Sequence, residues 1–262
     1  MPSLRRSLLR RYRVVAPQLL RSGLLLLVLL LLWDGVAALC VPQIQAALSL
    51  NPTVNRQTAA PLVAPRLTDP GAAVLASDTF QRPDHAYWGT SPDGQSWQAD
   101  AGNVPYFAVF KHAGMLYAPA QPVTCDAILG PMVANEEVTF SASLSSYGPP
   151  SLGAVLRWSD PNDFYTAYLD GQNLVVARSM AGMVTPLQRM PFPAQNSQPY
   201  TFRFRVVGSQ LFAMVWPAGQ PAPVDWQIEV EDSALSSGHA GIRVLAQHNV
   251  QARVATFREV AS

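Results

Sequence analysis

Residues 152–178 read LGAVLRWSDPNDFYTAYLDGQNLVVAR, and this stretch decides the fold class of the chain. Leu152 to Trp158 is rich in aliphatic and aromatic residues, which suit a pleated, half-buried strand. Ser159 to Asp163 interrupts the run with proline, aspartate and asparagine, which favour tight turns. Asp170-Gly171 between two apolar runs is a strong hairpin signal, because glycine adopts positive φ without steric cost. The stretch therefore predicts three antiparallel strands joined by two short turns.

The same alternation of apolar runs and turn residues continues from Ser77 to the end of the sequence, and no long amphipathic helix interrupts it. Many short strands with frequent turns predict an all-β sandwich or barrel. The expected strands are Asp78–Phe80, Trp97–Ala99, Phe107–Phe110, Met115–Tyr117, Asp126–Leu129, Glu137–Ser143, Leu152–Trp158, Phe164–Leu169, Leu174–Arg178, Tyr200–Val207, Gln210–Trp216, Trp226–Glu231, His239–Gln247 and Ala252–Val260.

The residues before this β region divide into three parts. Residues 1–22 form a basic N-terminus, which is expected to stay on the cytoplasmic side of a membrane. Residues 23–41 are almost wholly apolar and are long enough for one transmembrane helix. The alternative is a signal sequence cleaved near Val36-Ala37-Ala38, and the uncleaved anchor is slightly favoured over it. Residues 42–76 are rich in proline and alanine and predict an extended linker. Residues 77–262 then form the folded domain.

Charge is distributed unevenly between these parts. Residues 1–40 carry six arginines and one acid, and since the whole chain carries +1, the remainder carries −4. A mildly acidic domain is a poor nucleic-acid binder, because phosphate neutralisation needs clustered lysine and arginine. The prediction is therefore a domain outside the cytoplasm, anchored to the membrane or, if the N-terminal segment is cleaved, secreted.

Several short motifs in the β region resemble one family. Asp78-Thr79-Phe80-Gln81-Arg82, Trp88-Gly89-Thr90 and Asp93-Gly94-Gln95-Ser96-Trp97 are similar to the opening of bacterial laminin-G-like domains in the concanavalin A-like lectin/glucanase superfamily. Gly153 to Trp158, Tyr165 to Tyr168 and Tyr200 to Gly208 resemble later parts of the same domains. This resemblance implies a jelly-roll sandwich of two antiparallel sheets. It also implies binding of glycans or proteins, because many members of the family do this.

Catalytic motifs are weak in this sequence. Glycoside hydrolysis usually needs two carboxylates on one face about 5–10 Å apart. Glucanases of the superfamily carry a Glu-x-Asp-x-x-Glu strand motif, which is absent here. Glu229 and Glu231 are the nearest candidate pair, since residues two apart on a strand share a face. Two cysteines and four isolated histidines offer no zinc or nucleophile motif. We therefore expect no catalytic residues and no enzyme activity.

Candidate ligand-binding residues come from the alternation of side chains along the strands. Arg157, Arg203, Arg205 and Arg243 occupy positions that favour one polar strip on the outer side of a single sheet. Tyr165 faces opposite to its aromatic neighbours, so it is a candidate for an exposed ring that contacts a sugar. The alternative is that the arginines lie along apolar surface with only their charged ends in water.

One turn is rich in oxygen ligands. Lectin-like sandwiches often bind calcium through loop carboxylates. Asp160 and Asp163 are the candidate ligands, and calcium is the only cofactor that the sequence offers. The alternative is ordinary turn chemistry, because aspartate is favoured in tight turns without any metal.

The sequence thus predicts a non-catalytic extracytoplasmic module that is tethered to the membrane or secreted. Its expected partner is a carbohydrate or a surface protein, with no role for nucleic acid. Two alternatives stay open. The first is a glycoside hydrolase or related sugar-processing enzyme of the same fold, and the second is a structural or protein-interaction domain.

Overall fold

The computed structural model describes residues 71–119, 121–247 and 249–262. The predicted basic N-terminus and transmembrane or signal segment lie outside these residues, as does the predicted linker up to residue 70. Within the described part, no helix is long and apolar enough to cross a membrane. Its one helix, α1, covers only Asp100–Asn103.

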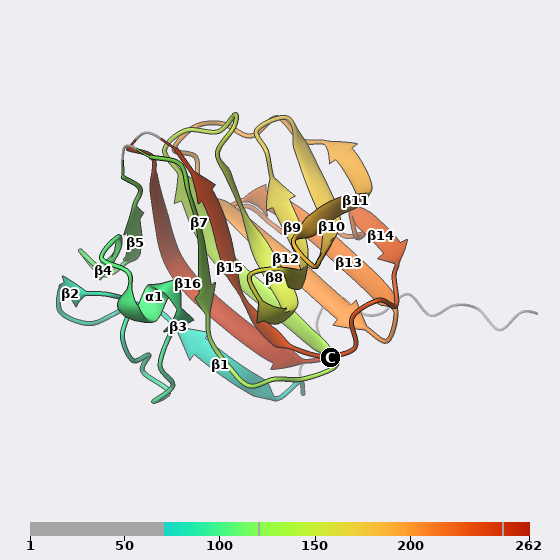
Figure 1. The fold of residues 1–262 in the computed structure, drawn as a ribbon, viewed down its shortest axis with the longest axis horizontal. Helices are drawn as coiled ribbons and strands as arrows, with labels where there is room; N and C mark the ends of the chain where they lie inside the picture. The colour runs from blue at the N-terminus through green and yellow to red at the C-terminus, as the bar shows by residue number, and fades with distance from the viewer. Residues whose placement is uncertain (1–70, 120, 248) are drawn as a thin grey trace, which may run out of the picture. The chain divides into compact units, whose positions relative to one another are not determined.

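Nine strands form the larger of two antiparallel sheets (Figure 1). Their order is β14-β13-β12-β7-β16-β5-β4-β2, and β1 also pairs with β16. The strands are β1 (Val74–Asp78), β2 (His85–Ala86), β4 (Phe107–Val109), β5 (Gly114–Tyr117), β7 (Glu136–Leu144), β12 (Tyr200–Val207), β13 (Gln210–Pro217), β14 (Ile228–Glu231) and β16 (Gln251–Ala261).

The second sheet has seven strands in the order β11-β10-β9-β8-β15-β6-β3. It contains β3 (Gln98–Ala99), β6 (Val123–Ile128), β8 (Ser151–Asp160), β9 (Asp163–Leu169), β10 (Asn173–Met180), β11 (Met183–Pro191) and β15 (His239–Ala246). Strands β8, β9 and β10 are the antiparallel run predicted from residues 152–178, and their pairing confirms it.

The two sheets face each other across one apolar core. Each strand sends alternate side chains inward, as the two-residue period of a strand requires. In β12, Phe202 and Phe204 are buried in this core, and Phe202 stacks on Phe140 of β7 with ring centroids 4.7 Å apart. Leu156 and Leu169 contribute to the same core from the seven-stranded sheet. Each sheet therefore keeps a second face that is turned away from the core.

Two differences from the sequence prediction concern the start of the domain and a strand at a sheet edge. The first strand begins at Val74, three residues before the expected domain start at Ser77, because Val74 and Ala76 pair with Val260 and Glu259 of β16. Strand β11 (Met183–Pro191) was not expected at all. Its side chains are mostly exposed, so its sequence lacks the apolar alternation on which the prediction relied.

Candidate functional site

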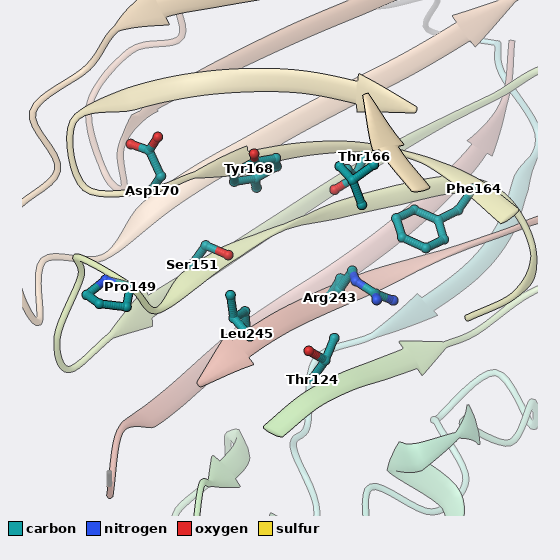
Figure 2. Close-up of a pocket in the computed structure, with 10 residues that line it drawn as sticks. Thr124, Pro149, Ser151, Phe164, Thr166, Tyr168, Asp170, Arg243 and Leu245 are labelled. Atoms are coloured by element: carbon teal, nitrogen blue, oxygen red, sulfur yellow. The ribbon is translucent and has the colours of Figure 1, made fainter. Parts of the chain in front are cut away.

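The outer face of the seven-stranded sheet carries a pocket of about 380 Å³, which we call the Tyr168 pocket (Figure 2). Its lining comes from strands β6, β8, β9, β11 and β15 and from the turns beside them. The lining residues are Thr124, Pro149, Ser151, Phe164, Thr166, Tyr168, Asp170, Val184, Arg243 and Leu245. Such a volume lies within the range typical of small-molecule sites.

Strand register places the two walls of the pocket. Across the sheet, Arg243 of β15 is paired with Gly153 of β8, and Gly153 is paired with Tyr168 of β9. A side chain at Gly153 would collide with the backbone oxygen of Ala167, so glycine lets β8 and β9 approach closely here. Arg243 and Tyr168, one strand to either side of Gly153, both line the pocket (Figure 2).

Arg243 is held firmly in this wall. Its Nη1 atom donates to both carboxylate oxygens of Asp126 on β6, at 2.6 Å each. Its guanidinium carbon lies 4.3 Å from the centre of the Phe164 ring, which is a cation–π contact. Burial raises the pKa of Asp126, and the charge of Arg243 partly offsets this rise. Arg243 is thus oriented before any ligand arrives, and its charge is already balanced.

The remaining lining mixes apolar surface with hydrogen-bonding groups. Phe164 and Thr166 are buried, and the Thr166 hydroxyl donates to the Ala154 oxygen at 2.9 Å. Tyr168 is half-buried, and burial raises the pKa of its phenol. Asp170 Oδ1 accepts the backbone N–H of Gln172 at 2.8 Å, which fixes the turn after β9. The pocket therefore offers an aromatic surface with donors and acceptors in fixed positions.

Arg157 and Tyr165, both predicted as ligand-binding residues, are instead buried. The Arg157 guanidinium donates to the backbone oxygens of Ala134 and Gly208 at 2.7 Å each. Burial also lowers its pKa. The Tyr165 hydroxyl donates to Asp232 Oδ1 at 2.6 Å. Arg157 has a positive φ of 48° where the pairing of β8 with β9 shifts, and this irregularity turns its side chain away from the surface.

The predicted single strip of four arginines is wrong. Arg203 and Arg205 lie on β12 in the nine-stranded sheet, whereas Arg157 and Arg243 lie on β8 and β15 in the other sheet. Alternation along a strand shows which of its residues share one face, but it does not show which sheet the strand belongs to. The prediction therefore grouped four arginines that lie on two different sheets. Of the predicted ligand-binding residues, only Arg243 lines the Tyr168 pocket.

The carboxylates predicted to bind calcium serve the β8–β9 turn. Asp160 Oδ1 accepts the backbone N–H of Asn162, and Asp163 Oδ1 accepts that of Ala181, at 2.7 Å each. Among the described residues, no group of three or more His, Cys, Asp or Glu side chains is placed to hold a metal ion. Both carboxylates therefore accept hydrogen bonds from turn residues, which is the turn chemistry that the sequence left open as an alternative.

The candidate catalytic pair lies outside the pocket lining. Glu229 and Glu231 are exposed on β14, the edge strand of the nine-stranded sheet. Glu231 Oε1 accepts a hydrogen bond from the Ser209 hydroxyl at 3.0 Å. The two carboxylates therefore share an edge strand, and neither lines the Tyr168 pocket.

Sequence reasoning missed the aromatic residues that do line the pocket, Phe164 and Tyr168. Their strand was predicted correctly, and they were placed on the face opposite Tyr165. The remaining signal was Gly153, because the hairpin register sets this glycine opposite Tyr168 on the outer face.

Comparison with known proteins bears on the fold. No family model matches the sequence, and no curated protein matches it. Among solved structures, carbohydrate-binding module CBM66 from Bacillus subtilis is 12% identical with a TM-score of 0.52, covering 63% of this chain and 95% of that one. The GH43 protein BlXynB from Bacillus licheniformis is 13% identical with a TM-score of 0.53, covering 71% of this chain and 39% of that one.

A third similar structure is the xylan β-1,4-xylosidase from Bacillus halodurans C-125, at 12% identity and a TM-score of 0.52. The match covers 70% of this chain and 38% of that enzyme, so this chain spans well under half of either GH43-type or xylosidase chain. At such identities the likeness concerns the fold alone. The chain has the all-β jelly-roll sandwich of two antiparallel sheets that its sequence predicts.

Proposed function

We propose that this chain is a non-catalytic module that binds an uncharged carbohydrate in the Tyr168 pocket. The observation that carries the proposal is the Arg243 guanidinium in the pocket wall. It is held in a fixed orientation, and Asp126 already balances its charge. A neutral ligand rich in hydroxyl groups can accept from this guanidinium without leaving an ion unpaired. The half-buried Tyr168 ring supplies an apolar surface on the opposite wall.

Other properties of the module are part of this proposal. The apolar segment 23–41 supports a location outside the cytoplasm, with a membrane anchor or a cleaved signal. The order of the aromatic and glycine motifs from Asp78 to Gly208 supports a laminin-G-like member of the fold. The involvement of Asp126 and Asp170 in internal hydrogen bonds supports binding without catalysis.

A glycan array and polysaccharide pull-down with the full chain in mild detergent test the proposal. Tyr168→Ala is expected to weaken binding about tenfold, because a stacked or packed ring contributes on the order of 1–1.5 kcal/mol beyond its area. Tyr117→Ala is the control, since Tyr117 is an exposed tyrosine on β5 of the other sheet.

Three results would change the proposal. Equal losses of glycan affinity in both tyrosine variants would show that the ligand does not bind in this pocket. Binding that disappears with a chelator would restore the calcium site predicted at Asp160 and Asp163. Release of new reducing ends from a polysaccharide, lost in Glu229→Gln or Glu231→Gln, would show an enzyme instead.

A further inference from the structure

The outer face of the nine-stranded sheet carries a second and larger cavity of about 670 Å³, which we call the Arg205 cavity. It lies in the other sheet from the Tyr168 pocket and shares no lining residue with it. The polar side chains that matter most for its chemistry are Thr139, Arg203, Arg205, Thr256 and Arg258.

Strand register brings the three arginines together. Arg203 on β12 and Arg258 on β16 are both paired with Thr139 on the intervening strand β7. Neighbouring strands are about 4.8 Å apart, so these two arginines flank Thr139 from strands roughly 10 Å apart. Arg205 lies two residues from Arg203 on the same face, opposite Glu137.

Only one of these three charges is balanced within the described structure. Glu137 Oε1 and Oε2 accept from Arg203 Nε at 2.7 Å and Nη2 at 2.9 Å, in a two-point ion pair. Trp226 also packs against Arg203, with the guanidinium carbon 4.9 Å from its ring centre. Neither Arg205 nor Arg258 forms an ion pair in the part of the chain that the structure describes. The cavity therefore holds two guanidinium groups that no described carboxylate pairs with, because its one acidic side chain, Glu137, is paired with Arg203.

Arg205 also has an unmet hydrogen bond. Its Nε atom is buried and has no acceptor within the structure. A buried N–H without a partner costs on the order of 1–3 kcal/mol, and more when the group is charged. Guanidinium groups pair with carboxylate and similar oxyanions through two parallel hydrogen bonds. An anionic oxygen in the cavity would accept a hydrogen bond from Arg205 Nε and would also balance the charge of the guanidinium.

We propose that the Arg205 cavity binds an acidic carbohydrate polymer through carboxylate or sulfate groups on its sugars. The hydroxyls of Thr139 and Thr256 border the charged groups and suit the neutral hydroxyls of such a polymer. The domain as a whole carries net negative charge, which opposes a densely charged partner such as duplex DNA. The site is distinct from the neutral-sugar pocket, and the proposal does not depend on that function.

The test measures binding of the full chain, in mild detergent, to polygalacturonate, dextran sulfate and uncharged dextran by affinity electrophoresis. We expect retardation by at least one charged polymer and none by dextran, and we expect salt to weaken binding. Polygalacturonate and dextran sulfate separate the carboxylate from the sulfate version. Arg205→Gln and Arg258→Gln are each expected to weaken binding about tenfold, as loss of a charged hydrogen bond predicts.

Arg253→Gln is the matched control. Arg253 is exposed on the same strand as Arg258 but outside the cavity, so its loss changes the net charge equally. Binding by this variant is expected to stay within about twofold of the unmodified chain, because screening limits distant exposed charges. The basic N-terminus is present in every variant and cancels from the comparison. Arg205→Lys, which keeps the charge but loses the planar fork, is expected to bind with intermediate strength.

Equal weakening in the Arg253 and Arg258 variants would overturn the proposal in favour of diffuse attraction. Retardation that no cavity variant changes would also overturn it, since binding would then belong to another part of the chain. Binding to vesicles of phosphatidylglycerol but to neither charged polymer would identify a lipid surface instead. Tyr168→Ala is expected to leave retardation by the charged polymers unchanged. The two proposed sites are therefore tested by different variants, and a negative result for one does not count against the other.

Discussion

At the scale of single residues, burial separates structural polar groups from groups available to a ligand. Tyr165 and Tyr168 are three positions apart on β9, and they face opposite sides of the strand. The Tyr165 hydroxyl is tied to Asp232 and accepts the backbone N–H of Leu235 at 3.1 Å. Tyr168 lines the pocket, and its hydroxyl forms no hydrogen bond with the described residues. The same residue type thus stabilises the fold at one position and forms a surface at the other.

Tyr165→Phe is expected to lower the free energy of unfolding by about 1–3 kcal/mol, because it removes the hydroxyl that bonds the partly buried Leu235 N–H and the Asp232 carboxylate. Urea denaturation followed by fluorescence measures this change. Tyr168→Phe is the control and is expected to change stability by less than about 0.5 kcal/mol. A smaller loss in the Tyr165 variant than in the control would contradict this assignment.

The sequence predicted the candidate site only in part, and the reason is physical. Alternation along β9 correctly grouped Phe164, Thr166 and Tyr168 on one face. It did not say which face meets the core, because both faces of this strand are apolar or aromatic. Arg157 was misplaced because one residue with positive φ at a pairing irregularity rotates its side chain out of the regular alternation. Local patterns do not reveal such irregularities.

At the scale of elements, long strands with strict alternation were the most predictable. Tyr200–Val207 was predicted with the bounds that β12 has, and the predicted Gln210–Trp216 falls one residue short of β13. Strand β11 was missed because it lies at the sheet edge with exposed side chains. Core packing therefore requires apolar residues at alternate positions of a buried strand. An edge strand is held mainly by backbone hydrogen bonds, which do not require this alternation.

Strand β1 provides a prediction at this scale. A fragment of residues 77–262 lacks Val74 and Ala76, which pair with β16, and Ala76 is buried in the core. We expect it to be less stable than a fragment of residues 71–262 by about 1 kcal/mol for each lost backbone hydrogen bond. Thermal denaturation of both fragments by circular dichroism measures the difference. Identical melting temperatures would show that β1 contributes nothing to the sandwich.

At the scale of the whole molecule, two buried acids join the sheets. Glu136 at the start of β7 and Glu259 near the end of β16 are fully buried, and each carboxyl group influences the pKa of the other. Glu136 Oε1 also accepts the backbone N–H of Arg157 from the opposite sheet, at 2.8 Å. Gly130 has no side chain, which leaves room for the Glu259 carboxyl. Burial raises the pKa of Glu259 to about 8 and the pKa of Glu136 well above its ordinary value.

This pair predicts a fall in stability with rising pH. An ordinary glutamate has a pKa of 4.5, so the unfolded chain releases its proton above that value, while folded Glu259 retains it until about pH 8. Folding therefore binds protons in this window, and the free energy of unfolding decreases as pH rises from 4.5 to 8. The contribution is fully present below pH 4.5 and lost above pH 8.

Melting temperatures recorded from pH 5 to pH 9 test this expectation. The unmodified chain is expected to melt at progressively lower temperature, and Glu259→Gln is expected to flatten the profile and to be the more stable form at pH 9. Glu229→Gln, at an exposed position on β14, is expected to keep the original slope. A slope unchanged by Glu259→Gln would assign the pH dependence to other groups.

The two outer faces of the sandwich have one more consequence. The Tyr168 pocket and the Arg205 cavity belong to different sheets, and the core that separates them fills the space between their inner faces. A short ligand cannot reach both sites. Because the two proposed ligands also differ in charge, simultaneous occupancy would cross-link two different polymers instead of binding one polymer at two points. Cross-linking depends on stoichiometry, because excess polymer places each protein on a separate chain. Such a module would act as a bivalent cross-linker between a neutral and an acidic glycan network.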